Sequence, residues 1–174
     1  SGYLHNHARM WFASILVFTL KLPWELGADF FLRHLLDGDP ASNTLSWRWV
    51  AGLHTKGKTY LAKSDNISKF TKGRYTNITN LSNEALPVRS VSETPTLLPL
   101  PIHEPFKSVG PTGLLLTDED LNPARLIEET GPLVAVANFS SVEQRSSLPI
   151  SPNVLNFVCG AHEDAGLRFK KMKC

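Results

Sequence analysis

The sequence predicts a mainly helical protein that continues into a proline-rich strap and a small α/β segment. Over residues 1–75, apolar side chains recur at helical spacing, which is typical of packed amphipathic helices. Between residues 76 and 112, prolines gather and neither a helical nor a strand period is visible, so an extended linker or strap is expected. In residues 113–174, two short apolar runs precede a long amphipathic stretch, which predicts two strands and a helix. We therefore expect three regions with these boundaries.

The first predicted helix extends from about Tyr3 to Leu20. Its apolar face consists of Leu4, Ala8, Trp11, Ile15 and Phe18. Near its start, Asn6, Arg9 and Met10 lie at positions i, i+3 and i+4, so their side chains can meet one ligand together. The apolar part from Met10 to Leu20 is too short to span a bilayer, and we expect a buried helix.

His5 and His7 raise the question of a metal site on this helix. Because they are two residues apart on a helix, their side chains are expected to diverge by roughly 200°. No third ligand is evident in the sequence, so no metal site is predicted.

Two further amphipathic stretches predict helices on either side of the central turn. One helix is expected from Trp24 to Leu36, after the break at Pro23. Its inward stripe is expected to consist of Leu26, Phe30, Phe31, His34 and Leu35. A shorter helix is expected from Asp65 to Gly73, because a glycine suits the position that follows a helix.

The Asp37-Gly38-Asp39 segment predicts a turn that leads into another helix. Gly38 tolerates positive φ, and aspartate side chains bond the nearby backbone. Asp39 followed by Pro40 is typical of an N-cap and the first helical position, so we expect a helix from Pro40 to Ala51.

Asn43 and Trp47 are four residues apart on this helix and share a face, whereas Trp49 is expected on another. A polar turn followed by an amide and an indole on one face suits a flat aromatic ligand with polar edges. The alternative is a capped helix whose tryptophans belong to the core.

The basic residues are unevenly distributed, although the net charge of +2 is close to neutral. Seven basic side chains between Arg48 and Arg74 are accompanied by one acid, Asp65. Such a segment suits phosphate contacts, and a solvated basic surface is an equally good interpretation. Cys159 and Cys174 have neither metal-ligand nor disulfide spacing, so we expect a reducing, cytoplasmic environment.

In the last two regions, the sequence predicts secondary structure but shows no catalytic or binding motif. The apolar side chains of the strap are expected to lie against another part of the protein; they are Leu97, Leu98, Leu100 and Ile102. Beyond the strap, Gly113–Leu121 is expected to form a buried strand followed by a capped turn, Pro132–Asn138 a second strand, and Val154–Lys171 a helix. The buried face of that helix is expected to consist of Val154, Phe157, Val158, Ala161, Ala165 and Phe169. Because no phosphate loop, nucleophile elbow or metal cluster is visible, no chemistry is expected in this segment.

Three motifs of the first region resemble a known family. They are Gly2-Tyr-Leu-His-Asn6-His-Ala-Arg9-Met10, Trp24-x-x-Gly27 and Leu36-Asp37-Gly-Asp39-x-Ala-Ser-Asn43-x-x-Ser-Trp47-x-Trp49. Their order and spacing resemble the helical FAD-binding half-domain of the DNA photolyase/cryptochrome family, and most closely the class I cyclobutane pyrimidine dimer photolyases. The resemblance covers residues 1 to about 75 and leaves the strap and everything after it outside.

The resemblance implies an FAD site and light-driven electron transfer from the flavin to a flipped-out pyrimidine dimer in DNA. The implied FAD-binding residues are Asn6, Arg9, Asp37, Gly38, Asp39 and Asn43. The implied catalytic residues are Asn43, which would face flavin N5, and the electron-carrying tryptophans Trp47 and Trp24. The expected contacts to damaged DNA are Asn6, His7, Met10, Trp49, Lys56 and Lys58. Within the resemblance, Arg9 would pair with Asp37, and an amide at position 43 favours repair over signalling.

Some features depart from the family pattern. His7 stands where dimer photolyases usually carry arginine, and the family's upstream part, with its diphosphate-binding loop, has no counterpart here. We therefore expect a truncated gene product, a fragment or one half of a split protein. The FAD pocket is expected to be incomplete and the chain inactive by itself.

Three functions follow from these observations as alternatives. The first is FAD-dependent, light-driven DNA repair in the intact parent protein. The second is a cryptochrome-like blue-light photoreceptor without repair, and the third is a non-enzymatic remnant or interaction module that binds no flavin. The expected partners are damaged DNA and a second polypeptide or N-terminal half that completes the pocket, with no membrane.

Overall fold

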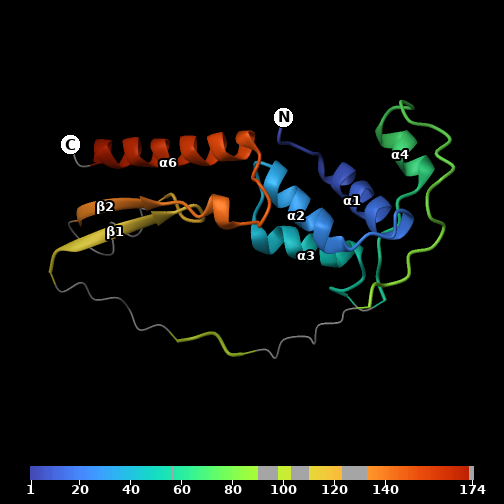
Figure 1. Cartoon of the computed structure of the whole chain (residues 1–174), viewed down its shortest axis with the longest axis horizontal. Helices are drawn as coiled ribbons and strands as arrows, with labels where there is room; N and C mark the ends of the chain where they lie inside the picture. The colour runs from blue at the N-terminus through green and yellow to red at the C-terminus, as the bar shows by residue number, and fades with distance from the viewer. Residues whose placement is uncertain (56, 90–97, 103–109, 123–132, 173–174) are drawn as a thin grey trace. The chain divides into compact units, whose positions relative to one another are not determined.

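A computed structural model describes residues 1–55, 57–89, 98–102, 110–122 and 133–172 (Figure 1). The chain separates into two compact units, Ser1–Glu93 and Thr94–Cys174. The first unit contains α1 (Asn6–Ser14), the π-helix η1 (Ile15–Thr19), α2 (Trp24–His34), α3 (Pro40–Val50) and α4 (Ser64–Phe70). The second unit contains β1 (Thr112–Thr117), β2 (Leu133–Phe139), the short 3-10 helix η2 (Val142–Gln144) and α6 (Pro152–Met172). Within the described residues, no helix combines the length and apolar character that a transmembrane segment requires.

The first helix begins one turn later than predicted, at Asn6, because His5 is its N-cap. His5 has an extended backbone, and its Nδ1 accepts a hydrogen bond from the backbone N–H of His7 at 3.3 Å. The prediction that His5 and His7 diverge is therefore wrong. Their rings stack with centroids 5.5 Å apart, since the capping residue lies outside the helix and turns back over its first turn.

The core of the first unit lies between α1, η1, α2 and α3. Its buried members are Ala13, Val17, Phe18, Ala28, Phe31, Leu35, Trp47 and Val50. The predicted inward stripe of α2 is therefore wrong in part, because Leu26 and Phe30 are exposed. The small residues Gly27 and Ala28 are buried instead, and the missing side chain of Gly27 leaves room for the indole ring of Trp47.

The turn between α2 and α3 brings backbone segments close together. The N–H of Leu36 donates to the carbonyl of Gly2, and the N–H of Gly38 donates to the carbonyl of Leu35. A Cβ at Gly38 would lie 3.1 Å from the carbonyl oxygen of Leu32, so a larger residue would be crowded by the backbone at this position. It does not adopt the positive φ that the sequence suggested. Asp39 caps α3 as predicted, by accepting a hydrogen bond from the N–H of Ser42.

The short helix α4 is fastened to α1. The indole Nε1 of Trp11 donates to Oδ1 of Asn66 at 2.9 Å, and the N–H of Ala62 donates to Oγ of Ser14 at 2.8 Å. After α4, the chain turns through Lys72 and Gly73, which both have positive φ. The predicted helix therefore exists but ends at Phe70, three residues before Gly73.

The strap does not pack as expected over the residues that the structure describes. Leu98, Leu100 and Ile102 are 81%, 89% and 98% exposed, so the prediction that they lie against another part of the protein is wrong. Leu97 lies outside the described residues. The apolar character of these side chains did not predict burial correctly, because nearby prolines prevent the segment from joining a helix or a central strand.

In the second unit, β1 and β2 form a parallel two-stranded sheet and α6 lies alongside it (Figure 1). The predicted strands and helix are confirmed, with boundaries that differ by a few residues. Leu116 is buried, whereas its neighbour Leu115 is exposed, so β1 is not buried throughout. On α6, Phe157 is exposed rather than buried, and His162 joins the buried face instead.

Candidate functional site

A cavity of about 460 Å³ opens between α1, the α2–α3 turn and α3. Eight residues singled out from the sequence line it: Asn6, Arg9, Met10, Asp37, Gly38, Asn43, Trp47 and Trp49. The first three come from one face of α1, as their spacing predicted. A volume of this size is typical of a site for a small molecule or cofactor.

An ion pair closes one side of the cavity. The Arg9 Nη2 atom donates to both carboxylate oxygens of Asp37, at 3.1 and 2.9 Å. Its Nε atom donates to the carbonyl of Leu4, which orients the guanidinium group. The predicted pairing of Arg9 with Asp37 is therefore present. The carboxylate remains 60% exposed and can accept further hydrogen bonds from a ligand.

Asn43 is held by the neighbouring helix. Its Nδ2 atom donates to the carbonyl of Ala28 on α2 at 2.8 Å, which identifies the amide nitrogen and fixes the orientation of the group. The amide oxygen keeps its capacity to accept a hydrogen bond. Because an amide does not titrate, its hydrogen-bonding groups are the same at every pH at which the protein is folded.

Trp47 and Trp49 line the cavity in different ways. Trp47 is 2% exposed, its ring meets Phe31 edge-on at 5.0 Å, and its buried Nε1 has no hydrogen-bond partner among the described residues. Trp49 was expected to point elsewhere but also reaches the cavity. It is 41% exposed and stacks on Tyr60 with ring centroids 6.2 Å apart.

The lining combines an apolar floor with polar groups at its edge. The floor comes from Ala13, Phe31, Leu35 and Val50. The polar groups are amides, hydroxyls, an imidazole and a carboxylate, and the guanidinium of Arg9 is already neutralised by Asp37. Such a site suits a flat aromatic ring with hydrogen-bonding edges better than a compact anion.

Comparison with known protein families agrees with this interpretation. Residues 1–84 match the model of the FAD-binding domain of DNA photolyase. This part of the chain is therefore similar to a photolyase FAD-binding domain.

Several deoxyribodipyrimidine photo-lyases are similar to this photolyase-type unit. The protein of Streptomyces griseus is 42% identical over 78 residues, which cover 38% of this chain and 17% of the relative. That of Escherichia coli is 40% identical over 60 residues, which cover 34% of this chain and 13% of the relative. That of Buchnera aphidicola is 33% identical over 90 residues, which cover 47% of this chain and 19% of the relative. The chain thus spans less than a fifth of the length of these relatives, and no solved structure matches it significantly.

The photolyase-type cavity fits one end of FAD better than the other. The apolar floor, the Asn43 amide and the Asp37 carboxylate match a flat ring with polar edges. A diphosphate needs uncompensated donors, and Arg9 is the one arginine or lysine among the lining residues. The described residues therefore suit the flavin ring, and the diphosphate requires donors from elsewhere.

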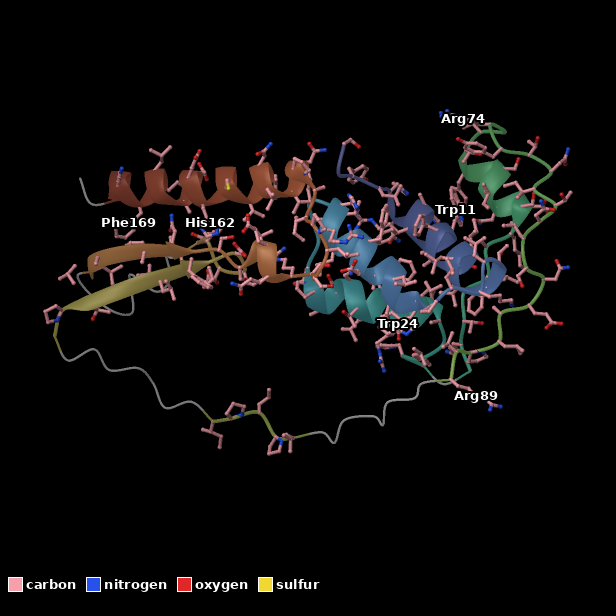
Figure 2. All side chains as sticks on the ribbon, in the orientation of Figure 1. Trp11, Trp24, Arg74, Arg89, His162 and Phe169 are labelled. Carbon is pink, nitrogen blue, oxygen red and sulfur yellow. The ribbon has the colours of Figure 1, made fainter. Side chains whose placement is uncertain are left out.

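Other predicted site residues lie apart from this cavity. Trp24 packs against the core at the start of α2, one turn before Gly27, on which Trp47 rests (Figure 2). The carboxylate of Asp39 caps α3, and the ring of His7 stacks on Phe70 at 4.6 Å. Lys58 is exposed and is not among the lining residues, and Lys56 lies outside the described residues. The proposed roles of these residues in binding or electron transfer remain predictions.

Sequence reasoning missed three polar residues of the photolyase-type site. Ser42, Ser46 and His54 also line the cavity. Ser42, Ser46 and Trp49 lie at i, i+4 and i+7, so the helical period could have identified the two serines. His54 follows α3 in a loop, where no period exists to place its side chain.

A cluster of charged side chains in the second unit was also missed. His162 Nε2 and Asp118 Oδ1 are 2.8 Å apart, and Arg145 Nη2 lies 3.5 Å from Oδ2 of the same carboxylate. Figure 2 shows His162 on the side of α6 that faces the strands. Burial raises the pKa of Asp118, but hydrogen bonds from His162, Ser140 and Ser141 and the charge of Arg145 lower it below its usual value. The cluster therefore ties the end of β1 to α6 with an ionised, nearly buried carboxylate.

Proposed function

We propose that residues 1–84 form one wall of the flavin and lesion site of a light-driven DNA repair enzyme. The observation that supports this most strongly is the cavity in which Asn6, Arg9, Asp37 and Asn43 surround an apolar floor. The match to a photolyase FAD-binding domain supports flavin as the ring that enters. Because the chain spans less than a fifth of its relatives, the activity is proposed for a longer protein or complex that contains it.

In this proposal, each residue acts through the contacts described above. Asp37, oriented by Arg9, accepts hydrogen bonds from the cofactor, and Asn43 offers a neutral amide to a ring nitrogen in either protonation state. FAD, when bound, supplies light-driven one-electron transfer to the dimer. Met10 and the half-exposed ring of Trp49 provide an apolar wall on which a flipped base can stack.

The rest of the cofactor requires a partner. The guanidinium of Arg9 is engaged by Asp37, so the lining offers little positive charge for a diphosphate. We therefore propose that a second polypeptide, or another segment of a longer chain, contributes the diphosphate donors. Damaged DNA is the proposed substrate, with Trp49 and Met10 near the lesion.

The flavin proposal is tested by comparing three ligands on the 174-residue chain: FAD, riboflavin and ADP. We expect FAD and riboflavin to bind with similar affinity and ADP to bind far more weakly, because the described residues suit the ring alone. Flavin fluorescence titration measures this, with retention through desalting as a second readout. Equal binding of ADP and FAD would contradict the assignment of the cavity to the ring.

A matched pair of variants locates the site. Asp37→Asn should weaken flavin binding about tenfold, because one charged hydrogen-bond acceptor is lost. Asp29→Asn is the control, since Asp29 pairs with Arg33 on α2 and does not line the cavity. If both variants bind flavin equally well, the cavity is not the flavin site.

Repair is tested in a longer protein or reconstituted complex that contains these residues. Asn43→Asp and Trp49→Ala should each reduce the light-driven turnover of pyrimidine dimers. If neither variant changed turnover, the lesion site would lie elsewhere. A protein that binds flavin and responds to light without any dimer turnover would be a photoreceptor, and the repair proposal would be rejected.

A further inference from the structure

We propose that the second unit pairs with a second copy of itself through the outer face of its sheet. This outer face consists of Gly113, Leu115, Thr117, Ala135, Ala137 and Phe139. The inference goes beyond the proposed function, because it concerns residues after the photolyase-type unit and requires neither flavin nor DNA.

The two faces of the sheet differ in what they contact. Leu116 and Asn138 are paired neighbours in the sheet. Leu116 is buried, and the Asn138 Nδ2 atom donates to the carbonyl of His162 on α6 at 3.4 Å. Figure 2 shows His162 and Phe169 on the side of α6 that faces the strands. Because successive side chains of a strand alternate between its faces, the residues on either side of Leu116 and Asn138 point away from α6 and belong to the outer face.

The outer face is apolar and open to solvent. Leu115 is 60% exposed and Phe139 is 52% exposed, and their paired neighbours are Ala137 and Thr117. All six residues of the outer face are uncharged. Parallel sheets are typically covered on both faces, and a sheet of two strands buries little apolar surface by itself. A partner on the outer face would therefore add apolar burial that the unit lacks.

The positions of the large and small side chains suit a second copy. In an antiparallel pairing about a twofold axis, each β2 lies over the β2 of the other copy, with Ala137 at the centre. Phe139 then lies over Ala135 of the other copy, so a large ring meets a small side chain twice. Leu115 is the paired neighbour of Ala137 and lies over its own counterpart. Side chains of facing sheets about 10 Å apart interdigitate in this way.

The charges at the two ends of the unit favour the antiparallel arrangement. The exposed acids Glu119 and Asp120 follow the carboxyl end of β1. From the contact of His162 with Asp118 at that end, α6 runs back toward the start of the strands, where it ends near the exposed Lys170 (Figure 1). An antiparallel pairing places the acidic end of each copy near the basic end of the other, whereas a parallel pairing places acid over acid.

The size of the outer face sets the expected strength of the association. Strands of six and seven residues form a face of roughly 20 by 10 Å. Stable interfaces bury about 800 Å² of each partner, which is more than such a face supplies. We therefore expect a weak dimer that forms as the protein concentration rises from micromolar to millimolar.

The test measures self-association of the full chain by sedimentation equilibrium over this concentration range. Leu115→Lys and Phe139→Lys should each weaken association about tenfold or more, because each places a charge in an apolar interface. The matched controls are Leu167→Lys and Phe157→Lys, which replace α6 side chains that are 57% and 52% exposed, and they should associate like wild type. Circular dichroism checks that every variant is folded.

Charge reversal tests the orientation of the two copies. Asp120→Lys and Lys170→Asp should each weaken association about two- to fivefold, because each replaces an attraction between exposed charges by a repulsion. The two substitutions in one chain should restore association, since the ends of the unit then exchange their charges. An unrelated protein on the outer face would not produce this restoration.

Three results would overturn the inference. They are a wild-type chain that stays monomeric at millimolar concentration, outer-face variants that associate like wild type, and loss of association in Leu167→Lys or Phe157→Lys, which would place the interface on α6. A double charge variant that associates more weakly than either single variant would reject the antiparallel arrangement. Flavin binding without self-association would reject this inference and leave the proposed function intact, so the two failures can be distinguished.

Discussion

Gly27 is the residue of α2 against which the ring of Trp47, on α3, packs. A Cβ at this position would overlap the ring of Trp47, which is almost fully buried. Gly27→Ala should therefore destabilise the first unit by about 1–3 kcal/mol, despite the higher helix propensity of alanine. Urea unfolding followed by tryptophan fluorescence measures the change.

Gly160 supplies the matched control for this substitution. It lies in α6, and no atom stands within 4 Å of the position of an added Cβ. Gly160→Ala should stabilise its helix by up to about 1 kcal/mol through propensity alone. Equal effects of the two substitutions would show that the contact between Gly27 and Trp47 does not contribute to the free energy of unfolding.

Asp118 makes the stability of the second unit depend on pH. Its folded pKa lies below the ordinary value, so the ionised form is favoured in the folded state. The stabilisation is present above the unfolded pKa of about 4 and is lost as the pH falls through the folded pKa. Unfolding measured between neutral and acidic pH should therefore show a decline that begins near pH 4.

Asp118→Asn should lower stability at neutral pH and flatten this acid decline. The groups that face the carboxylate are His162 on α6 and Arg145 after η2, and Arg145 also contacts Glu119. Asp120→Asn, an exposed carboxyl in the same turn, is the control and should keep the decline. An unchanged pH profile in Asp118→Asn would assign the acid sensitivity to other carboxyl groups.

At the scale of elements, α3 depends on its N-cap. Asp39 accepts a hydrogen bond from the N–H of Ser42, and α3 carries three residues of the cavity lining that the sequence had identified. Asp39→Ala should cost about 0.5–2 kcal/mol, whereas Asp39→Asn keeps the acceptor and should be nearly neutral. Thermal unfolding compares the two variants. A large loss in Asp39→Asn would mean that the charge, and not the cap, is what matters.

Local signals explain why the elements could be predicted well and their faces less well. The Asp39-Pro40 pair fixed the start of α3 correctly, because capping is a property of a few neighbouring residues. On α2, the large side chains of Leu26 and Phe30 suggested the wrong face. The helix turns Gly27 inward because the partner ring of Trp47 needs space, and this requirement comes from another helix.

Polar side chains also differ in whether the sequence could predict that they lie together. Asn6, Arg9 and Met10 could be grouped from their spacing on one helix, and all three line the cavity. The contact between Asp118 and His162 joins residues 44 positions apart, and no motif marks it in the sequence. Contacts between distant segments depend on packing, which a single sequence does not reveal.

At the scale of the whole molecule, the exposed segment around Leu98–Ile102 should be the first place where a protease cuts. Leu98, Leu100 and Ile102 are almost fully exposed, and cleavage requires an accessible extended backbone. Thermolysin at low concentration should yield two fragments that correspond to the two units, identified by mass spectrometry. Earlier cuts at Leu26 or Leu45, which are exposed but helical, would contradict this expectation.

The hydrogen bond from Asn43 to Ala28 also has an evolutionary consequence. One side chain serves both the ligand site and the contact between two helices, so a mutation that alters the chemistry at this position also removes a structural bond. Natural proteins lie only slightly above the stability that they need. A lineage that exchanged Asn43 would therefore first have to acquire compensating substitutions in α2 or α3, and the order of mutations would be constrained by folding rather than by catalysis.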